Sequence, residues 1–436
     1  MVDVSEGEPF VPWLSTIART IERNPVRATM MKIGEGKGNC ISLAAGKPSV
    51  EVFPPAVREA VGDEMASYGN HLAVGCAELK SWARSFVDEF CCPAGGWASR
   101  DVLITSGTTD GITKALMLLT DPGDVILADE FTYPAIRVTG LALGRRLVGI
   151  PMGSGGMLPD ALAAALDQLE GSARVLYLTT HGQNPTGLTM SVDRQAELYR
   201  VARRYGLTII EDDSYFALNL ASRDPGAPLT PDCMSGTANF PSCLLSIDVD
   251  GRVVRLDSTS KMLAPGFRLG WVTAPKALLE KWALVAEVFT WSVSAFEQKA
   301  LLNLLQDWGP EGLNLQLQRL QFTYARKRDF LVAACERHLQ GLCRWHVPDF
   351  GMFVWLEVLG DFDTLIMNDK IIENYGVGMV PGAVFRAVKD DDTPCAFFRL
   401  SFSLLEEETA NTAMERLRTA LLTARSDAAG RDQRMT

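Results

Sequence analysis

The chain of 436 residues carries 42 Lys and Arg against 53 Asp and Glu, which gives a formal net charge of −11 at pH 7. This length allows two or three domains, and a composition of 47% hydrophobic and 22% charged residues excludes a wholly disordered chain. The negative charge disfavours nucleic-acid binding, and no apolar run reaches the roughly 18 residues that a membrane helix needs. The acidic start MVDVSEGEPF is unlike a signal peptide, so we expect a cytoplasmic protein.

From about residue 100, short apolar runs alternate with segments of helical spacing. This alternation is typical of an α/β fold, in which a mostly parallel sheet is covered by helices on both faces. Seven runs are predicted to be its strands: 102–105, 125–128, 147–150, 175–179, 207–210, 253–256 and 271–273.

One of the connecting helices has clear start and stop signals. Ser191 can cap its N-terminus, and Leu198, Val201 and Ala202 repeat on one face. Gly206 can adopt the left-handed conformation that ends a helix, directly before the next predicted strand. Together they predict half of a βαβ unit with a short connection.

After about residue 300 the pattern changes to that of a second, smaller α+β domain. A long helical stretch precedes predicted strands at 352–357 and 397–402 and a final amphipathic helix at about 407–424. The polar tail beyond it is expected to fray. We predict an N-terminal segment at 1–45 that joins the small domain and the substrate pocket, a large cofactor-binding domain at 46–300, a small domain at 301–425 and a tail at 426–436.

The cysteines and histidines give no sign of a disulfide framework or a metal site. The nine cysteines include no C-x-x-C pair, and the four histidines show no H-x-x-x-H spacing. Reduced thiols in a cytosolic protein are the expected state. We therefore predict no metal cofactor built from neighbouring ligands.

The strongest chemical signal lies in residues 258–271. The segment follows a predicted strand and places Ser258, Ser260, Lys261 and Arg268 in a loop interrupted by Gly and Pro. A lysine is ordinarily a solvated surface charge. Here two hydroxyls and an arginine can bind a phosphate dianion while the lysine amine condenses with an aldehyde. A phosphate and an aldehyde on one molecule describe pyridoxal phosphate.

A second predicted strand ends in acids, in the segment 209–215. A carboxylate that faces a pyridine nitrogen keeps it protonated, as an electron sink requires. Asp212 or Asp213 could take this role, and the other would then be solvated or structural. The alternative is that the acids only cap the helix that follows the strand.

Two further loops follow predicted strands. Residues 182–187 read Gly-Gln-Asn-Pro-Thr-Gly, in which the Asn184 amide could contact a ring hydroxyl. Residues 105–110 open a helix with hydroxyl groups, which is typical of an anion site. Each loop alone could be structural, but all four fit one cofactor at the carboxyl ends of the strands.

These motifs resemble those of pyridoxal-phosphate-dependent aminotransferases of fold type I. The chain is most similar to the branch of aromatic, 2-aminoadipate and kynurenine aminotransferases. The resemblance runs from Ser-Leu-Ala-Ala-Gly-Lys-Pro at 42–48 to Phe-Arg-Leu-Ser-Phe at 398–402. The lysine loop is its most specific part, and the order and spacing of the other motifs support it.

The resemblance implies roles for the residues around the cofactor ring. Lys261 matches the Schiff-base lysine, and Asp212 matches the acid at the pyridine nitrogen, which favours it over Asp213. Tyr133 matches the aromatic residue stacked on the ring. Asn184 and Tyr215 match the residues that contact the ring oxygen. The residues implied as phosphate ligands are Ser106, Gly107, Thr108, Thr109, Ser258, Ser260 and Arg268.

The resemblance also implies how substrates and a second subunit reach the site. Arg399 matches the arginine that binds the α-carboxylate of the substrate, with Gly46 and Asn184 beside it. Tyr68 matches a tyrosine that reaches the phosphate of the neighbouring subunit, which implies a homodimer with shared sites.

The sequence departs from the family pattern at two positions. Asp110 places an acid near the phosphate loop, where relatives carry Gln. His181 stands where relatives often carry Pro-Xaa-Gly, and we expect it in a surface turn rather than in contact with substrate.

The predicted activity is transfer of an amino group from an aromatic or long-chain amino acid to a 2-oxo acid such as 2-oxoglutarate. Trp13, Leu14 and the segment 350–353 suggest an apolar pocket, although these residues could equally pack the small domain. One alternative keeps the cofactor but changes the reaction to that of a β-lyase, a decarboxylase or a specialised biosynthetic enzyme. The other is a non-catalytic, aminotransferase-like regulator, which would need a basic DNA-binding domain upstream.

Overall fold

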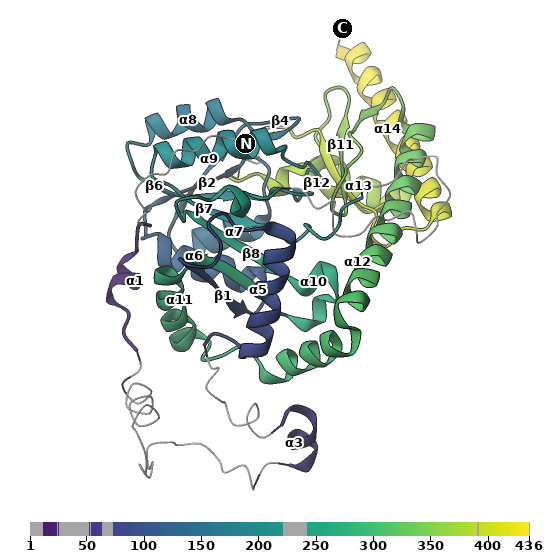
Figure 1. The fold of residues 1–436 in the computed structure, drawn as a ribbon. Coiled ribbons are helices and arrows are strands. Elements are labelled where there is room, and N and C mark those ends of the chain that lie inside the picture. The colour runs from purple at the N-terminus through teal and green to yellow at the C-terminus, as the bar shows by residue number, and fades with distance from the viewer. Residues whose placement is uncertain are drawn as a thin grey trace, which may run out of the picture.

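A seven-stranded sheet forms the centre of the larger domain in the computed structural model (Figure 1). The structure describes residues 12–23, 25, 52, 54–62, 73–220, 242–389 and 392–435. The strand order is β1-β9-β8-β7-β6-β2-β3, and β9 alone runs antiparallel to its neighbours. The strands are β1 (Arg100–Thr105), β2 (Val125–Asp129), β3 (Arg146–Ile150), β6 (Ala173–Leu178), β7 (Thr208–Asp212), β8 (Val253–Ser258) and β9 (Gly270–Pro275). All seven predicted strands and the mostly parallel sheet are confirmed.

Helices cover both faces of this sheet. Alternate residues of β2 divide between two apolar cores: Leu127 belongs to the core that includes residues of α5, α8 and α9, and Ile126 to the core that includes residues of α6, α7 and α11. This is the two-residue period expected of a strand buried on both faces. The helices are α5 (Ala77–Cys91), α6 (Thr108–Leu119), α7 (Pro134–Ala142), α8 (Pro159–Gln168), α9 (Val192–Arg204) and α11 (Lys276–Phe289).

The predicted start and stop of α9 are confirmed. The Ser191 side chain accepts a hydrogen bond from the Arg194 backbone N–H, and Gly206 follows the helix with φ of 68°. Shorter elements of the large domain are α3 (Pro55–Val61), α10 (Thr259–Met262) and the hairpin of β4 (Met152–Gly153) and β5 (Gly156–Met157).

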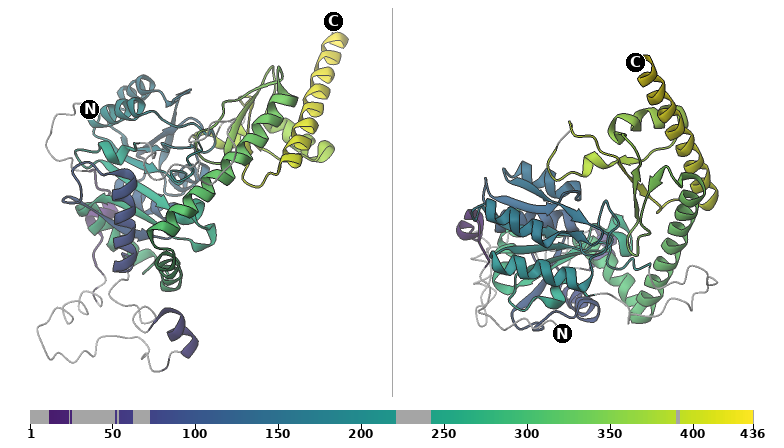
Figure 2. Two further views of the ribbon diagram at one scale, coloured as in Figure 1. Left: turned by 45° about the vertical axis from the view of Figure 1, so that its right-hand side comes forward. Right: turned by 90° about the horizontal axis from the view of Figure 1, so that it is seen from above.

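The smaller domain has an antiparallel sheet of order β10-β11-β13-β12, as expected of an α+β domain. The long helix α12 contains a kink at Gly309, directly before Pro310, and passes from the large domain into the small one (Figures 1 and 2). The elements are α12 (Ala295–Leu339), β10 (Cys343–Arg344), β11 (Phe353–Val358), α13 (Thr364–Tyr375), β12 (Val380–Pro381), β13 (Phe397–Ser401) and α14 (Glu407–Met435).

The C-terminal tail differs from the prediction. We expected a helix to about 424 and a frayed tail, whereas α14 continues to Met435 and projects from the small domain (Figure 2). The residues from 425 to 435 include three Arg and two Ala, which propagate a helix that has already started.

The described part of the N-terminal segment lies against the large domain. In front of α1 (Thr16–Thr20), the Ser15 backbone N–H donates to the Leu118 carbonyl at 2.8 Å, at the end of α6. Trp13 stacks under Arg174, with the guanidinium carbon 4.1 Å from the ring centroid. Neither Trp13 nor Leu14 lines the cavity described below.

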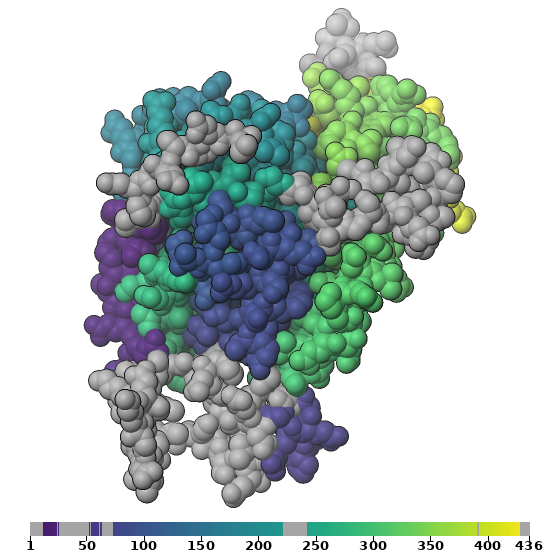
Figure 3. Space-filling view, viewed as in Figure 1, coloured from purple at the N-terminus to yellow at the C-terminus, as the bar shows by residue number. Residues whose placement is uncertain are grey.

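The two domains meet along the segments near residues 130 and 386. The Thr132 backbone N–H donates to the Phe385 carbonyl at 2.8 Å, and Ala387 donates to the Glu130 carbonyl at the same distance. In the space-filling view the green and yellow C-terminal residues adjoin the teal part of the large domain (Figure 3). Among the described helices, none is both long enough and apolar enough to cross a membrane.

Candidate active site

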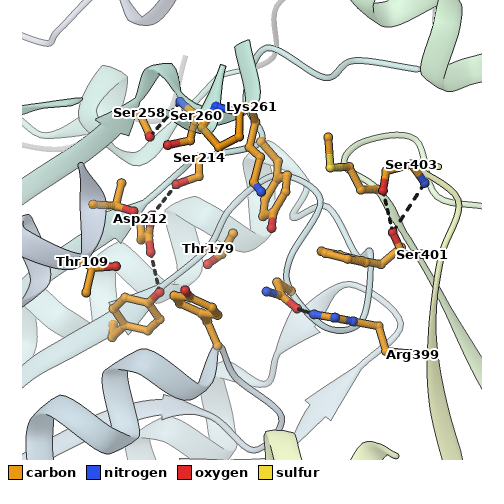
Figure 4. A pocket seen from close by; sticks show the side chains of 18 of the residues that line it. Thr109, Thr179, Asp212, Ser214, Ser258, Ser260, Lys261, Arg399, Ser401 and Ser403 are labelled. Atoms are coloured by element: carbon orange, nitrogen blue, oxygen red, sulfur yellow. Dashed lines mark hydrogen bonds between the residues drawn. The ribbon is translucent and has the colours of Figure 1, made fainter. Parts of the chain in front are cut away.

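A cavity of about 430 Å³ opens at the carboxyl ends of β6, β7 and β8 and is closed on the far side by β13 of the small domain (Figure 4). The predicted site residues that line it are Thr108, Thr109, Tyr133, Asn184, Asp212, Tyr215, Ser258, Ser260, Lys261, Arg268 and Arg399. The structure therefore brings together residues that are far apart in the sequence. Gly46 and Tyr68 lie outside the described residues.

Asp212 is the last residue of β7 and is held by two hydroxyl groups. Tyr177 donates to Asp212 Oδ2 at 2.7 Å, and Ser214 donates to Oδ1 at 3.0 Å. Burial raises the pKa of Asp212 to about 6, against the lowering effect of these two hydrogen bonds. The arrangement orients the carboxylate, and a positive charge in the cavity would stabilise its ionised form.

Lys261 extends into the cavity from the short helix α10 (Figure 4). The Ser258 hydroxyl caps this helix by accepting from the Ser260 backbone N–H at 3.1 Å. Burial, and then the positive charges of Arg399 and Arg268, lower the pKa of Lys261. A lowered pKa increases the fraction of neutral amine, which is the nucleophilic form.

The N-terminus of α6 and Arg268 form one corner of the cavity. Arg268 Nη1 lies 3.5 Å from Ser260 Oγ, and Nη2 lies 3.5 Å from the Ser106 carbonyl oxygen. Gly107, with φ of 81°, caps the helix, and a Cβ on it would lie 2.9 Å from Arg268 Nη2. Helix N–H groups, hydroxyls and a guanidinium are the donors that bind a phosphate dianion.

The acid beside this corner is already paired. Asp110 Oδ2 accepts from the Ser106 backbone N–H at 3.1 Å, and Oδ1 contacts the ammonium group of buried Lys114. The lysine offsets the negative charge, so Asp110 braces the loop without opposing an anion in the corner.

Arg399 projects from β13 toward the large domain. Its Nη1 donates to Asn184 Oδ1 at 2.8 Å, and its guanidinium lies over the rings of Phe353 and Phe385, at 4.3 and 4.8 Å from their centroids. Within the described residues, Arg399 Nε is buried and has no hydrogen-bond partner. The aromatic faces hold the planar group in place, so it can meet a carboxylate.

Two tyrosines add aromatic surface to the cavity. Tyr133 stands directly before α7, and Tyr215 is buried in the turn after β7. Burial, and then the charge of Asp212, raise the pKa of Tyr215, so its hydroxyl keeps its proton and can donate.

Sequence reasoning missed several cavity residues: Tyr177, Thr179, Ser214, Ser401 and Ser403. The first two could have been found, because they alternate with Leu176 and Leu178 along β6 and so share the face of a strand that ends at the site. The serines have no comparable signal, since hydroxyl residues are common after any strand.

The expectation for His181 is wrong. It is fully buried rather than in a surface turn, and its Nδ1 lies 2.7 Å from Asp213 Oδ2. Asp213 is accordingly structural and does not line the cavity. The pairing joins residues 32 positions apart, so the sequence alone gives no local sign of it.

Comparison with known proteins identifies the family of the chain. The family model of class I and II aminotransferases matches residues 39–417. The mitochondrial kynurenine/alpha-aminoadipate aminotransferase of Mus musculus is 33% identical over 420 residues, which cover 90% of this chain and 94% of that protein. An aromatic amino acid aminotransferase of Schizosaccharomyces pombe is 34% identical over 366 residues, or 78% of this chain and 76% of the yeast protein.

The fold comparison agrees. The crystal structure of aminotransferase Aro8 from Candida albicans superposes with a TM-score of 0.83 at 24% identity, over 95% of this chain and 99% of that chain. The chain therefore belongs to the class I and II aminotransferases, enzymes that use pyridoxal phosphate as cofactor.

Proposed function

We propose that this aminotransferase moves an amino group from an aromatic or long-chain amino acid to a 2-oxo acid such as 2-oxoglutarate. The observation that carries the proposal is the single cavity that contains the Lys261 amine, the Asp212 carboxylate and the Arg399 guanidinium. No feature of the described residues favours a β-lyase, a decarboxylase or a non-catalytic protein over this activity.

The residues present fit pyridoxal phosphate. Arg268, Ser258, Ser260 and the 106–109 loop would hold its phosphate, because the glycine at 107 leaves space beside the guanidinium. Asp212 would pair with the pyridine nitrogen, Asn184 and Tyr215 would contact the ring oxygen, and Tyr133 would stack on the ring. When bound, the cofactor supplies an aldehyde that reacts with amines and a ring that withdraws electrons from the attached carbon.

Each remaining residue has a defined task. Lys261 Nζ would hold the aldehyde carbon and, once displaced by the donor amine, would take the proton from the donor Cα and deliver it to the cofactor carbon that had carried the aldehyde. Arg399 would bind the α-carboxylate in a bidentate pair, with Gly46 and Asn184 beside it. Asp212 would stay ionised and stabilise positive charge at the ring nitrogen.

The proposed donor class rests on the apolar part of the cavity. Met352, Phe353, Tyr133 and Tyr215 supply thioether and aromatic surface there. The names of the mouse and yeast relatives point to the same class of donors. Burial of a large apolar side chain contributes about 1.5–3 kcal/mol, which favours an aromatic donor over aspartate by roughly ten- to a hundredfold.

A donor panel with 2-oxoglutarate tests this proposal. We expect higher kcat/KM for phenylalanine, tyrosine, tryptophan or kynurenine than for aspartate. Met352→Ala should lower kcat/KM for phenylalanine more than for aspartate, since it removes apolar contact only. An enzyme that uses aspartate best would refute the donor class and leave the cofactor chemistry intact.

We further propose a homodimer in which Tyr68 of one subunit reaches the phosphate of the other. Supporting it, the junction of α11 and α12 exposes large apolar side chains: Val288 at 55%, Phe289 at 58%, Trp291 at 41% and Phe296 at 50%. Such a cluster is typical of a protein interface. Coexpression of Lys261→Ala and Tyr68→Ala chains should restore activity that neither has alone, whereas sites formed within one subunit would give none.

Domain limits and cellular location are also proposals. We propose 1–45, 46–300, 301–425 and 426–436 as the divisions of the chain, testable by limited proteolysis. The limit at 300 lies within α12, whose residues up to Leu317 pack in the core of the large domain, and the limit at 425 lies within α14. A cytosolic location stays a prediction, supported by seven free cysteines among the described residues, which suit a reducing compartment. The mouse relative is named mitochondrial, so cell fractionation is the deciding measurement.

A further inference from the structure

A cluster of buried charges lies behind the strand ends that face the cavity. We call it the β7 anchor; it comprises Glu211, Asp213, Arg255, Asp257 and His181. Arg255 is fully buried, with Nη1 3.0 Å from Asp213 Oδ2 and 3.3 Å from Glu211 Oε2 and with Nη2 2.9 Å from Asp257 Oδ1. Buried charges require partners, and loss of one partner is costly.

His181 completes this anchor through two contacts with one carboxylate. Its backbone N–H donates to Asp213 Oδ1 at 3.2 Å, and its ring Nδ1 lies 2.7 Å from Oδ2. Burial alone would raise the pKa of Asp213, but His181 and Arg255 lower it to about 2. The carboxylate is therefore ionised and only accepts, so Nδ1 must carry a proton and donate it.

Two aromatic rings and a hydroxyl group also pack against the imidazole. The centroids of Phe216 and Phe350 lie 5.3 and 5.1 Å from that of His181, and the Thr180 hydroxyl lies 3.1 Å from Nδ1. Within the described part of the chain, His181 Nε2 has no hydrogen-bond partner. The ring N–H of His181 therefore donates to Asp213, and His181 does not line the cavity.

Residues that face the cavity alternate with anchored residues at the end of β7. Asp212 and Ser214 line the cavity, whereas Glu211 and Asp213 are fixed behind them. Glu211 accepts from the Thr180 hydroxyl at 3.1 Å and from the Leu244 backbone N–H at 2.8 Å. Contacts from the loop after β6, which also carries Asn184, therefore set the position of the strand end that carries Asp212.

We propose that His181 is a positioning residue for amino transfer: by donating to Asp213, it fixes the end of β7 and thereby aims the Asp212 carboxylate at the ring nitrogen of the cofactor. The inference rests on the role of Asp212 in the proposed function. Its action passes through Asp213, because His181 contacts that carboxylate with both its backbone N–H and its ring and is not among the residues that line the cavity.

Two substitutions separate hydrogen-bond donation from packing. His181→Phe can fill the space between Phe216 and Phe350 but has no donor, whereas the Asn amide in His181→Asn can donate from nearly the place of Nδ1. The readouts are the Kd of pyridoxal phosphate for the apoenzyme and the visible circular dichroism of the holoenzyme, which reports the orientation of the cofactor. His338→Phe is the matched control, because His338 contacts Asn411 in the small domain.

We expect His181→Phe to raise the Kd roughly tenfold and to change the visible circular dichroism, as loss of a hydrogen bond to a charged group predicts. His181→Asn should restore both to near the wild-type values, and His338→Phe should alter neither. If His181→Phe does not fold, His181→Leu provides the donor-free variant, with His181→Asn again the comparison.

The inference is overturned if the donor-free variant binds and orients the cofactor as the wild type does, or if His181→Asn is as impaired as the donor-free variant. Asp212→Asn is measured alongside them. If Asp212→Asn has no effect on Kd, the proposed site itself fails; if it weakens binding while the His181 variants do not, only the role of His181 fails.

Discussion

Tyr177→Phe isolates one hydrogen bond at the centre of the site. The substitution removes a single oxygen from a side chain that is 1% exposed and leaves its ring in place. That oxygen donates to Asp212 Oδ2 at 2.7 Å. Ser214 remains as the second donor to the same carboxylate, at 3.0 Å.

The size of the effect follows from the pKa of Asp212, which is about 6 in the native protein. A hydrogen bond to a charged group contributes about 1.5–3 kcal/mol, and one pKa unit corresponds to about 1.4 kcal/mol. Tyr177 donates to the ionised form, so its removal favours the protonated form. We therefore expect the pKa of Asp212 to rise by about one unit or slightly more.

Cofactor affinity of the apoenzyme, measured between pH 5 and 8, detects this shift. Binding should weaken as the pH falls and Asp212 takes up a proton, and in Tyr177→Phe the weakening should begin about one pH unit higher. The ratio of the variant Kd to the wild-type Kd should approach about tenfold near pH 5 and decline toward one near pH 8.

Tyr199→Phe is the matched control for this experiment. Tyr199 is also 1% exposed, and its hydroxyl lies 2.5 Å from Asp250 Oδ1 and 3.1 Å from Asp248 Oδ1, away from the cavity. It should lose stability without moving the pH midpoint of cofactor binding. An unchanged midpoint in Tyr177→Phe, or an equal shift in Tyr199→Phe, would refute the reasoning.

Three further predictions concern the reacting groups. Lys261→Ala should reduce turnover by several orders of magnitude, because the nucleophile and the proton carrier are lost together; a borohydride-reducible link of the cofactor to another lysine would contradict it. Asp212→Asn should lower kcat far more than Asp213→Asn does. Urea unfolding should instead show the larger loss of stability for Asp213→Asn, because this substitution breaks the pairs with His181 and Arg255. The reverse ranking of kcat would mean that Asp213 is the ring partner. Arg399→Lys should raise KM for every amino acid donor by about ten- to a hundredfold, since the bidentate pair is lost, and a KM raised for only one donor would place Arg399 at the side-chain end of the substrate.

Much of the fold was predictable because buried strands have a recognisable pattern in the sequence. Parallel strands covered on both faces are continuous apolar runs, so all seven strands of the large sheet were located. The helix that starts after Ser191 was located by its cap and by Gly206. The end of α14 was not located, because a polar segment can either fray or extend a helix that already exists.

The site was predictable where the chemistry needs a recognisable motif. Lys261 and Arg268 follow β8, Asp212 ends β7, and the structure brings the three to one cavity. Residues that act across the fold were not predictable. Tyr177 lies 35 positions from Asp212, and His181 was expected at the surface because nothing near it in the sequence shows a buried acid. Pairings of this kind become visible only once the strand order is known.

The helix α12 gives the enzyme a mechanical property. Leu317 belongs to the core of the large domain and Ala325 to that of the small domain, and the helix crosses from one to the other without a break, over about 12 Å. An unbroken helix acts as a stiff rod rather than as a flexible tether. The walls that carry Lys261 and Arg399 are therefore joined by a rigid element, so a change in their separation has to bend this helix or shift its packing.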